Sequence, residues 1–163
     1  MINTELYRVA ENTVEYLKEK GLTVATAESC TGGMVSSFIT SVSGVSQVFE
    51  LGITSYTCEI KNKILGVSEE ILKKYGAVSE QTAKEMARNI RKMANTDIGA
   101  SVTGVAGPAG SEEHDPGYVF IAVSDKNGTC VKLLNIEPKS RNFVREKATE
   151  ALLELIKFNA EEL

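Results

Sequence analysis

Helical and extended patterns alternate along most of this chain of 163 residues. Apolar residues that recur every three or four positions predict amphipathic helices, and short β-branched apolar runs between them predict buried strands. Capping residues and glycines mark several helix ends. The helices are expected at 4–20, 34–39, 61–65, 69–75, 80–94 and 140–158. The strands are expected at 22–27, 49–57, 98–103, 118–123 and 129–136, the last two joined by a turn at 125–128.

This order of elements predicts an α/β fold. A sheet whose strands are joined mostly by helices buries both of its faces, so we expect a three-layer α/β/α sandwich with a mixed sheet. The length is that of one domain, and no repeat or linker interrupts residues 1–163. The chain is therefore expected to be a single domain over 1–163.

The net charge and the cysteines indicate which kinds of ligand the protein binds and in which cellular compartment it is found. A formal net charge of −4 argues against nucleic-acid binding, which needs clustered Lys and Arg, although it leaves room for a small anionic ligand. Cys30, Cys58 and Cys130 form no C-x-x-C pair, so we expect neither a disulfide framework nor a zinc site. With no secretory signal and no run of ~20 apolar residues, a cytoplasmic protein that does not bind membranes is expected.

Polar and glycine-rich segments follow three of the expected strands. They are Glu28 to Gly33, Tyr56 to Lys61 and Thr103 to Gly110. In open α/β sheets, ligands bind beyond the carboxyl ends of the strands. We therefore expect the three segments to meet and to form the functional site.

Ser29 lies at the first of these strand-to-helix turns and is followed by Thr31, Gly32 and Gly33. Glycines at such a turn let backbone amides converge on a negative oxygen, so the turn suits an oxyanion hole or a phosphate cradle. It is neither a Walker A loop nor G-x-S-x-G. The alternative is structural, with Ser29 and Thr31 merely capping the next helix.

A serine nucleophile needs a base. His114 is the only histidine and lies in a polar loop that is expected to be exposed. Lys61 is the better candidate, although each unit by which its pKa must fall costs about 1.4 kcal/mol, which burial would have to supply. Tyr56 is expected to hydrogen-bond this lysine or to relay a proton. The alternatives are a solvated Lys61 and a Tyr56 that only packs.

Other groups near the expected site have weaker signals. The Thr103–Gly104 turn allows close approach of a ligand but is equally good as a plain turn. Arg145 is placed to reach a phosphate from the last helix, where most arginines face water instead. Cys30 is expected to be a small buried residue rather than a rival nucleophile.

The run Thr26–Gly33, reading T-A-E-S-C-T-G-G, resembles the signature of the C-terminal domain of competence/damage-inducible protein CinA. Further similar segments follow in order over nearly the whole chain: 52–56, Lys61, 65–67, 75–80, 103–108, Arg141 and Arg145. The single-domain members of that family are nicotinamide-nucleotide amidases, and this chain looks like one of them.

The resemblance implies hydrolysis of nicotinamide mononucleotide to nicotinate mononucleotide and ammonia, without metal or cofactor. It implies Ser29 as nucleophile, Lys61 as general base and Tyr56 as supporting residue. Amides near Gly32 and Gly33 would hold the oxyanion. It also implies substrate contacts from Glu28, Thr31, Gly32, Gly33, Thr103, Gly104 and Arg145, and assembly into homodimers or larger homo-oligomers.

The segment from Ala109 to Gly117 departs from the family pattern, which commonly has G-G-T and later K-P-V-G. The missing lysine is expected to affect substrate preference before activity. Two other functions stay open at this stage. One is a non-catalytic nucleotide-binding or regulatory module linked to competence or DNA damage. The other is a Mg²⁺-dependent transferase that uses the glycine turn as a phosphate cradle.

Overall fold

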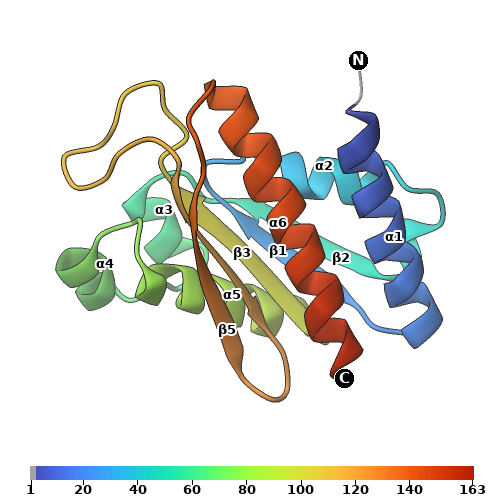
Figure 1. Ribbon diagram of the computed structural model, residues 1–163. Helices are drawn as coiled ribbons and strands as arrows, with labels where there is room; N and C mark the ends of the chain where they lie inside the picture. The colour runs from blue at the N-terminus through green and yellow to red at the C-terminus, as the bar shows by residue number, and fades with distance from the viewer. Residues whose placement is uncertain (1–2) are drawn as a thin grey trace.

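A five-stranded sheet forms the centre of the computed structural model, which describes residues 3–163 (Figure 1). The strand order is β2-β1-β3-β4-β5. β1 (Val24–Glu28) pairs in parallel with β2 (Phe49–Thr54) and β3 (Ile98–Gly104), whereas β4 (Tyr118–Ser124) and β5 (Thr129–Asn135) add antiparallel strands. The sheet is therefore mixed, and its parallel half places three strand ends together.

Helices cover both faces of this sheet. The larger core lies beneath α1 (Thr4–Lys20), α2 (Met34–Thr40) and α6 (Arg141–Glu161). The opposite face packs on α5 (Glu80–Ala94), whose Met86 and Ile90 bury against β1. The remaining helical segments are α3 (Cys58–Lys63), α4 (Glu69–Tyr75) and a short 3₁₀ turn, η1 (Val45–Gln47). The three-layer sandwich predicted from the order of elements is confirmed.

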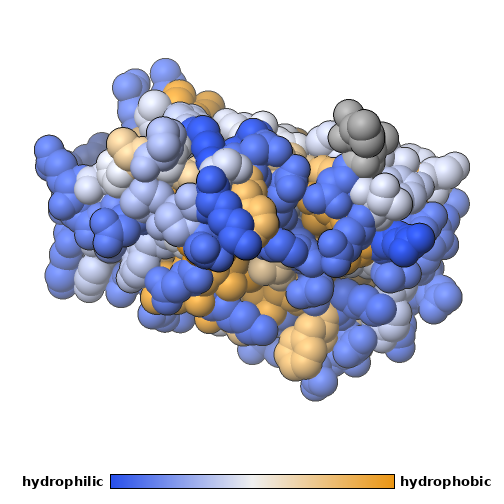
Figure 2. Space-filling model, turned by 45° about the horizontal axis from the view of Figure 1, so that its top comes forward, coloured by the Kyte–Doolittle hydropathy of each residue, from blue (hydrophilic) through white to orange (hydrophobic). Residues whose placement is uncertain are grey.

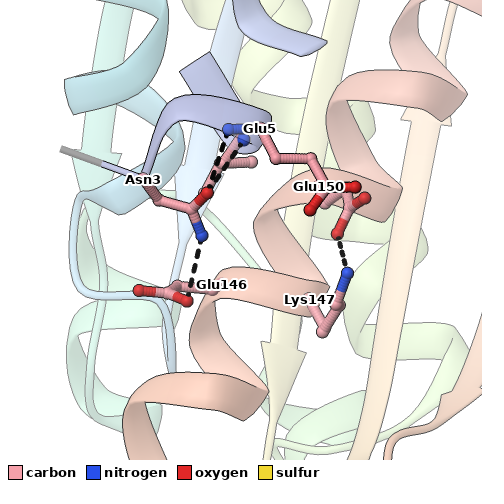
Figure 3. Close-up of polar contacts among 6 residues, drawn as sticks. Asn3, Glu5, Glu146, Lys147 and Glu150 are labelled. Atoms are coloured by element: carbon pink, nitrogen blue, oxygen red, sulfur yellow. Dashed lines mark hydrogen bonds and ion pairs between the residues drawn. The ribbon is translucent and has the colours of Figure 1, made fainter. Parts of the chain in front are cut away.

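Local capping explains most helix ends. The side chains of Asn3, Ser68, Ser79 and Ser140 accept hydrogen bonds from amides in the first turns of α1, α4, α5 and α6, and Gly21 ends α1 with φ of 64°. The Asn3 amide group also donates to Glu146 of α6 at 3.2 Å (Figure 3). This contact ties the start of α1 to α6, next to the Lys147–Glu150 ion pair.

The view in Figure 2 brings the upper end of Figure 1 forward and presents a mostly hydrophilic surface, with apolar atoms in patches between charged side chains. Among residues 3–163, no helix combines the length and the apolar composition that crossing a membrane requires. A few large apolar side chains are exposed: Tyr56, Ile64, Tyr75, Met93, Leu133 and Phe158.

Candidate active site

The three parallel strands reach the same edge of the sheet, where β3 continues two residues further, to Gly104. Glu28, the last residue of β1, is in register with the last residue of β2 and with Val102 of β3. The residues that follow these three registered positions all carry a hydroxyl group and lie at the same edge of the sheet: Ser29, Ser55 and Thr103. This is the place at which an open α/β sheet binds its ligands.

Ser29 lies in direct contact with Lys61. The Lys61 Nζ is 3.0 Å from the Ser29 Oγ and donates a 2.6 Å hydrogen bond to the main-chain carbonyl of Ser55. Ser29 is 8% exposed and Lys61 is completely buried. The pair thus has the geometry of a nucleophile and its base, within the 2.6–3.2 Å reach that proton transfer requires.

The start of α3 decides where the Lys61 side chain lies. The sequence predicted a helix that begins at Lys61, but α3 begins at Cys58, because the Thr57 hydroxyl caps it by accepting from the Ile60 amide at 3.2 Å. Lys61 is therefore inside the helix. Just after α3, Leu65 and Val67 are buried with apolar side chains of β1, which holds the helix over the sheet.

Burial also sets the electrostatics of the lysine. Removal from water lowers the pKa of Lys61 from its ordinary value, because a charged amine is solvated poorly inside the protein. No carboxylate in residues 3–163 lies within ion-pair distance of it. Burial therefore shifts the balance toward the neutral amine, whose lone pair can accept the Ser29 proton.

Tyr56 lies at the site but does not contact the lysine. Its hydroxyl accepts a 2.8 Å hydrogen bond from Arg141 Nη2, and its side chain is 59% exposed. The predicted Tyr56–Lys61 hydrogen bond is therefore wrong, since Lys61 points into the protein while Tyr56 points outward. Arg141 also donates to the Gly107 carbonyl, so it joins α6 to two other segments of the site.

Arg141 was noted in the sequence only as part of a family motif, and its position one helical turn before Arg145 was the available signal that both lie on one face of a helix. Arg145 is half-buried, and its Nη2 donates to the Thr31 carbonyl at 2.8 Å. Arg145 thus contacts the turn that follows Ser29. A guanidinium has five N–H donors, so some remain for an anion.

Glu28 and Thr31 lie inside the protein. Both are completely buried, and the Thr31 hydroxyl donates to the Glu28 carboxylate at 2.6 Å. Side-chain contact of these two residues with a substrate, as predicted, would require this buried arrangement to open. The structure instead makes them part of the framework behind Ser29.

Gly32 and Gly33 have φ values of 61° and 92°, a region that side chains rarely adopt, so the turn needs glycine at both positions. Their amides are already engaged, since Gly32 donates to the Ser29 carbonyl at 3.0 Å and Gly33 to Glu28 at 3.1 Å. This argues against the predicted role of these two amides in holding an oxyanion.

Thr103 and Gly104 also have structural partners. The Thr103 hydroxyl donates to the Ala77 carbonyl at 2.8 Å and is 1% exposed. A Cβ at Gly104 would come within 2.7 Å of Val119 on β4. The glycine is thus explained by close strand pairing, and any substrate contact here falls to the main chain.

Two competing nucleophile–base schemes lose support. Burial raises the pKa of the Cys30 thiol to about 11, so it stays protonated and unreactive. His114 was expected to be exposed but is half-buried, because its ring stacks on Tyr118 at 4.2 Å and Nε2 contacts the Val78 carbonyl at 3.1 Å. It is anchored in the 109–117 loop and contacts neither Ser29 nor Lys61.

Fold and site together define a class: α/β/α proteins that hold a serine next to a buried lysine at the carboxyl ends of parallel strands. The chain belongs to the family described as CinA C-terminal domain, whose model matches residues 6–159. This places most of the described chain, including every residue of the site, within one family domain.

Individual relatives also carry CinA or competence-damage names. The chain is 46% identical over 158 residues to a CinA-like protein of Kosmotoga olearia, covering 93% of this chain and 38% of that one. It spans 35–39% of the length of the first curated relatives that it matches.

Two solved structures are similar over nearly their whole length. The competence/damage inducible protein CihA from Agrobacterium tumefaciens superposes with a TM-score of 0.93 at 32% identity, covering 99% of this chain and 98% of that one. A competence or damage-inducible protein from Enterobacter asburiae gives 0.91 at 31% identity, with coverages of 95% and 98%.

Proposed function

We propose that this domain is a nicotinamide-nucleotide amidase, which hydrolyses nicotinamide mononucleotide to nicotinate mononucleotide and ammonia. The observation that carries the proposal is the Ser29–Lys61 contact of 3.0 Å with the lysine completely buried. A carboxamide is a poor electrophile, so its hydrolysis needs an activated nucleophile of this kind. The resemblance of the T-A-E-S-C-T-G-G run to the amidase family supports the choice of substrate.

The first half of the reaction is acylation. Neutral Lys61 takes the Ser29 proton while the Ser29 oxygen bonds to the carboxamide carbon, which places the negative charge on the carboxamide oxygen. The Lys61 ammonium then gives that proton to the departing nitrogen. The C–N bond breaks, ammonia leaves, and an ester of nicotinate mononucleotide with Ser29 remains.

The second half is hydrolysis of that ester. Lys61, neutral again, takes a proton from water, whose oxygen bonds to the same carbon. The ester bond breaks, and the proton returns to the Ser29 oxygen. The Tyr56 oxygen accepts a hydrogen bond from Arg141, which leaves its own proton available to the leaving group or to the substrate.

Anion recognition belongs to the same proposal. Arg145 lies beside the nucleophile turn, where its remaining N–H groups suit the substrate phosphate. Main-chain groups of Thr103 and Gly104, at the end of β3, suit the ribose. Assembly into a homodimer or larger homo-oligomer is proposed from the family resemblance, and residence in the cytoplasm is proposed from the sequence features given above.

The test is ammonia release from nicotinamide mononucleotide by purified protein in EDTA. Ser29→Ala is measured in parallel, with Ser37→Ala, an exposed serine of α2, as the matched control. We expect release by wild type and Ser37→Ala and none by Ser29→Ala, which should still bind the nucleotide by calorimetry.

Release by Ser29→Ala at the wild-type rate would remove Ser29 as nucleophile. Nucleotide binding without release by wild type would favour a binding or regulatory module. Activity that appears only with Mg²⁺ would favour a transferase.

A further inference from the structure

Glu28 is the most heavily hydrogen-bonded side chain around the site. Its Oε2 accepts from the Thr31 hydroxyl at 2.6 Å and from the Gly33 and Val35 amides at 3.1 and 3.0 Å. Its Oε1 accepts from the amide and the hydroxyl of Ser36 at 2.8 and 2.7 Å. Five donors thus converge on one completely buried carboxylate.

These donors come from the turn that follows the nucleophile and from the first turn of α2. A buried carboxyl group is retained only when hydrogen bonds satisfy its oxygens. Glu28 immediately precedes Ser29 and binds residues three to eight positions further along the chain. It therefore fixes the Ser29–Gly33 turn to the first turn of α2.

The same bonds decide which amides remain available. Gly33, Val35 and Ser36 donate to Glu28, while Gly32 and Met34 donate to carbonyls within the turn itself. Among the described residues, the Thr31 amide has no hydrogen-bond acceptor, but Thr31 is completely buried, so this amide is closed to a substrate.

We propose that Glu28 is a positioning residue, whose buried carboxyl group holds the Ser29–Gly33 turn so that the Ser29 hydroxyl stays within reach of Lys61. The inference deepens the proposed function, because it rests on Ser29 as nucleophile, but it does not depend on the nicotinamide substrate. Glu28 acts through geometry and touches no reacting atom. Its role differs from the substrate contact expected from the sequence.

The test uses phenylmethanesulfonyl fluoride, which reports on Ser29 without a nucleotide. The Ser29 oxygen bonds to sulfur, the S–F bond breaks, fluoride leaves and Lys61 takes the proton. Intact-mass spectrometry follows the adduct with time for wild type and Glu28→Gln, which keeps the size of the side chain but loses one acceptor oxygen. Thr13→Val is the control, since it removes one buried hydrogen bond between α1 and α6 and one within α1, away from the turn.

We expect the sulfonylation rate of Glu28→Gln to fall about 100-fold, the effect of misplacing a reacting group by about 1 Å, while Thr13→Val reacts like wild type. The acid limb of the rate against pH should stay where it is in wild type, because Glu28 does not work through the Lys61 charge. With active enzyme, kcat should fall and KM should change little.

An unchanged rate in Glu28→Gln, a shifted acid limb, or an equal slowing in Thr13→Val would each overturn the inference. If Glu28→Gln does not fold, Thr31→Val carries the test, with a rate several-fold lower expected and an unchanged rate contradicting it. Wild type that is sulfonylated at Ser29 but releases no ammonia from the nucleotide would refute the proposed substrate and leave the role of Glu28 standing. Wild type that does not react at Ser29 would refute both.

Discussion

Burial of the Lys61 amine should have two consequences, a base for Ser29 and a cost in stability, and replacing Lys61 by methionine tests both. Methionine has a similar length and no charge, so it suits a completely buried position. The variant loses the base that lies 3.0 Å from Ser29 Oγ. A positioned general base contributes about 10²–10⁴ in rate, or roughly 3–5 kcal/mol of barrier, so turnover should fall by that factor.

The effect on stability has the opposite sign and depends on pH. Burial lowers the pKa of Lys61 in the folded state, so between that value and the unfolded value of about 10.4 the unfolded chain binds more protons. The free energy of unfolding of wild type therefore rises with pH through this window. The total rise is about 1.4 kcal/mol for each unit by which folding lowers the pKa of Lys61. Below the pKa that Lys61 has in the folded state, the full cost of burying the charged amine lowers the stability of wild type.

Urea unfolding of wild type and Lys61→Met from pH 7 to about 10.4 measures this difference, because the other titrating groups are common to both proteins. We expect the gap in stability to favour the variant near neutral pH and to shrink as pH rises. Parallel curves would show that Lys61 does not titrate abnormally. A variant rate within tenfold of wild type, or one that recovers fully at higher pH, would refute its role as base.

Three further experiments test other parts of the structure. Tyr56→Phe should lower kcat about 10- to 100-fold without unfolding the protein, since it removes only the hydroxyl that a guanidinium holds; steady-state kinetics decide this. Ser55→Ala should leave the urea midpoint unchanged, because that hydroxyl has no hydrogen-bond partner among residues 3–163. Ser101→Ala loses a buried 2.6 Å hydrogen bond, so its free energy of unfolding should fall by about 1 kcal/mol. Equal losses of stability in the two variants would contradict this. Gly99→Ala should lower Tm by several degrees, because its Cβ would overlap the backbone of α5, and a Tm equal to wild type would show that the helix moves away at little cost.

Local signals in the sequence predicted the sandwich and most helix ends. Asn3, Ser79 and Gly21 act on amides or carbonyls within a few residues of themselves, so a capping pattern can be recognised without knowing the rest of the fold. The hairpin turn is equally local, since Asp125 accepts from the amides of Asn127 and Gly128. The short helix was predicted three residues late because the cap at Thr57 was overlooked.

The sequence predicted which residues lie at the candidate site, but it did not predict the contacts of Tyr56 and Glu28. The order of strands brings the ends of β1, β2 and β3 together, which is why Ser29 and Lys61 were paired from sequence. Tyr56 was assigned to the lysine because the two are close in the chain, yet its partner, Arg141, is 85 positions away. Glu28 was assigned to the substrate from the family resemblance, whereas its five donors become partners only when the turn folds back on it.

The sequence by itself determined the elements, their order and the chemical groups at the sheet edge, because periodicity, caps and glycines act over a few residues. Only the tertiary structure decided that Lys61 is buried with a lowered pKa, that Glu28 faces inward, and which donors its carboxyl group binds. Burial and hydrogen-bond competition depend on every segment that packs around a group, and those segments are distant in the chain.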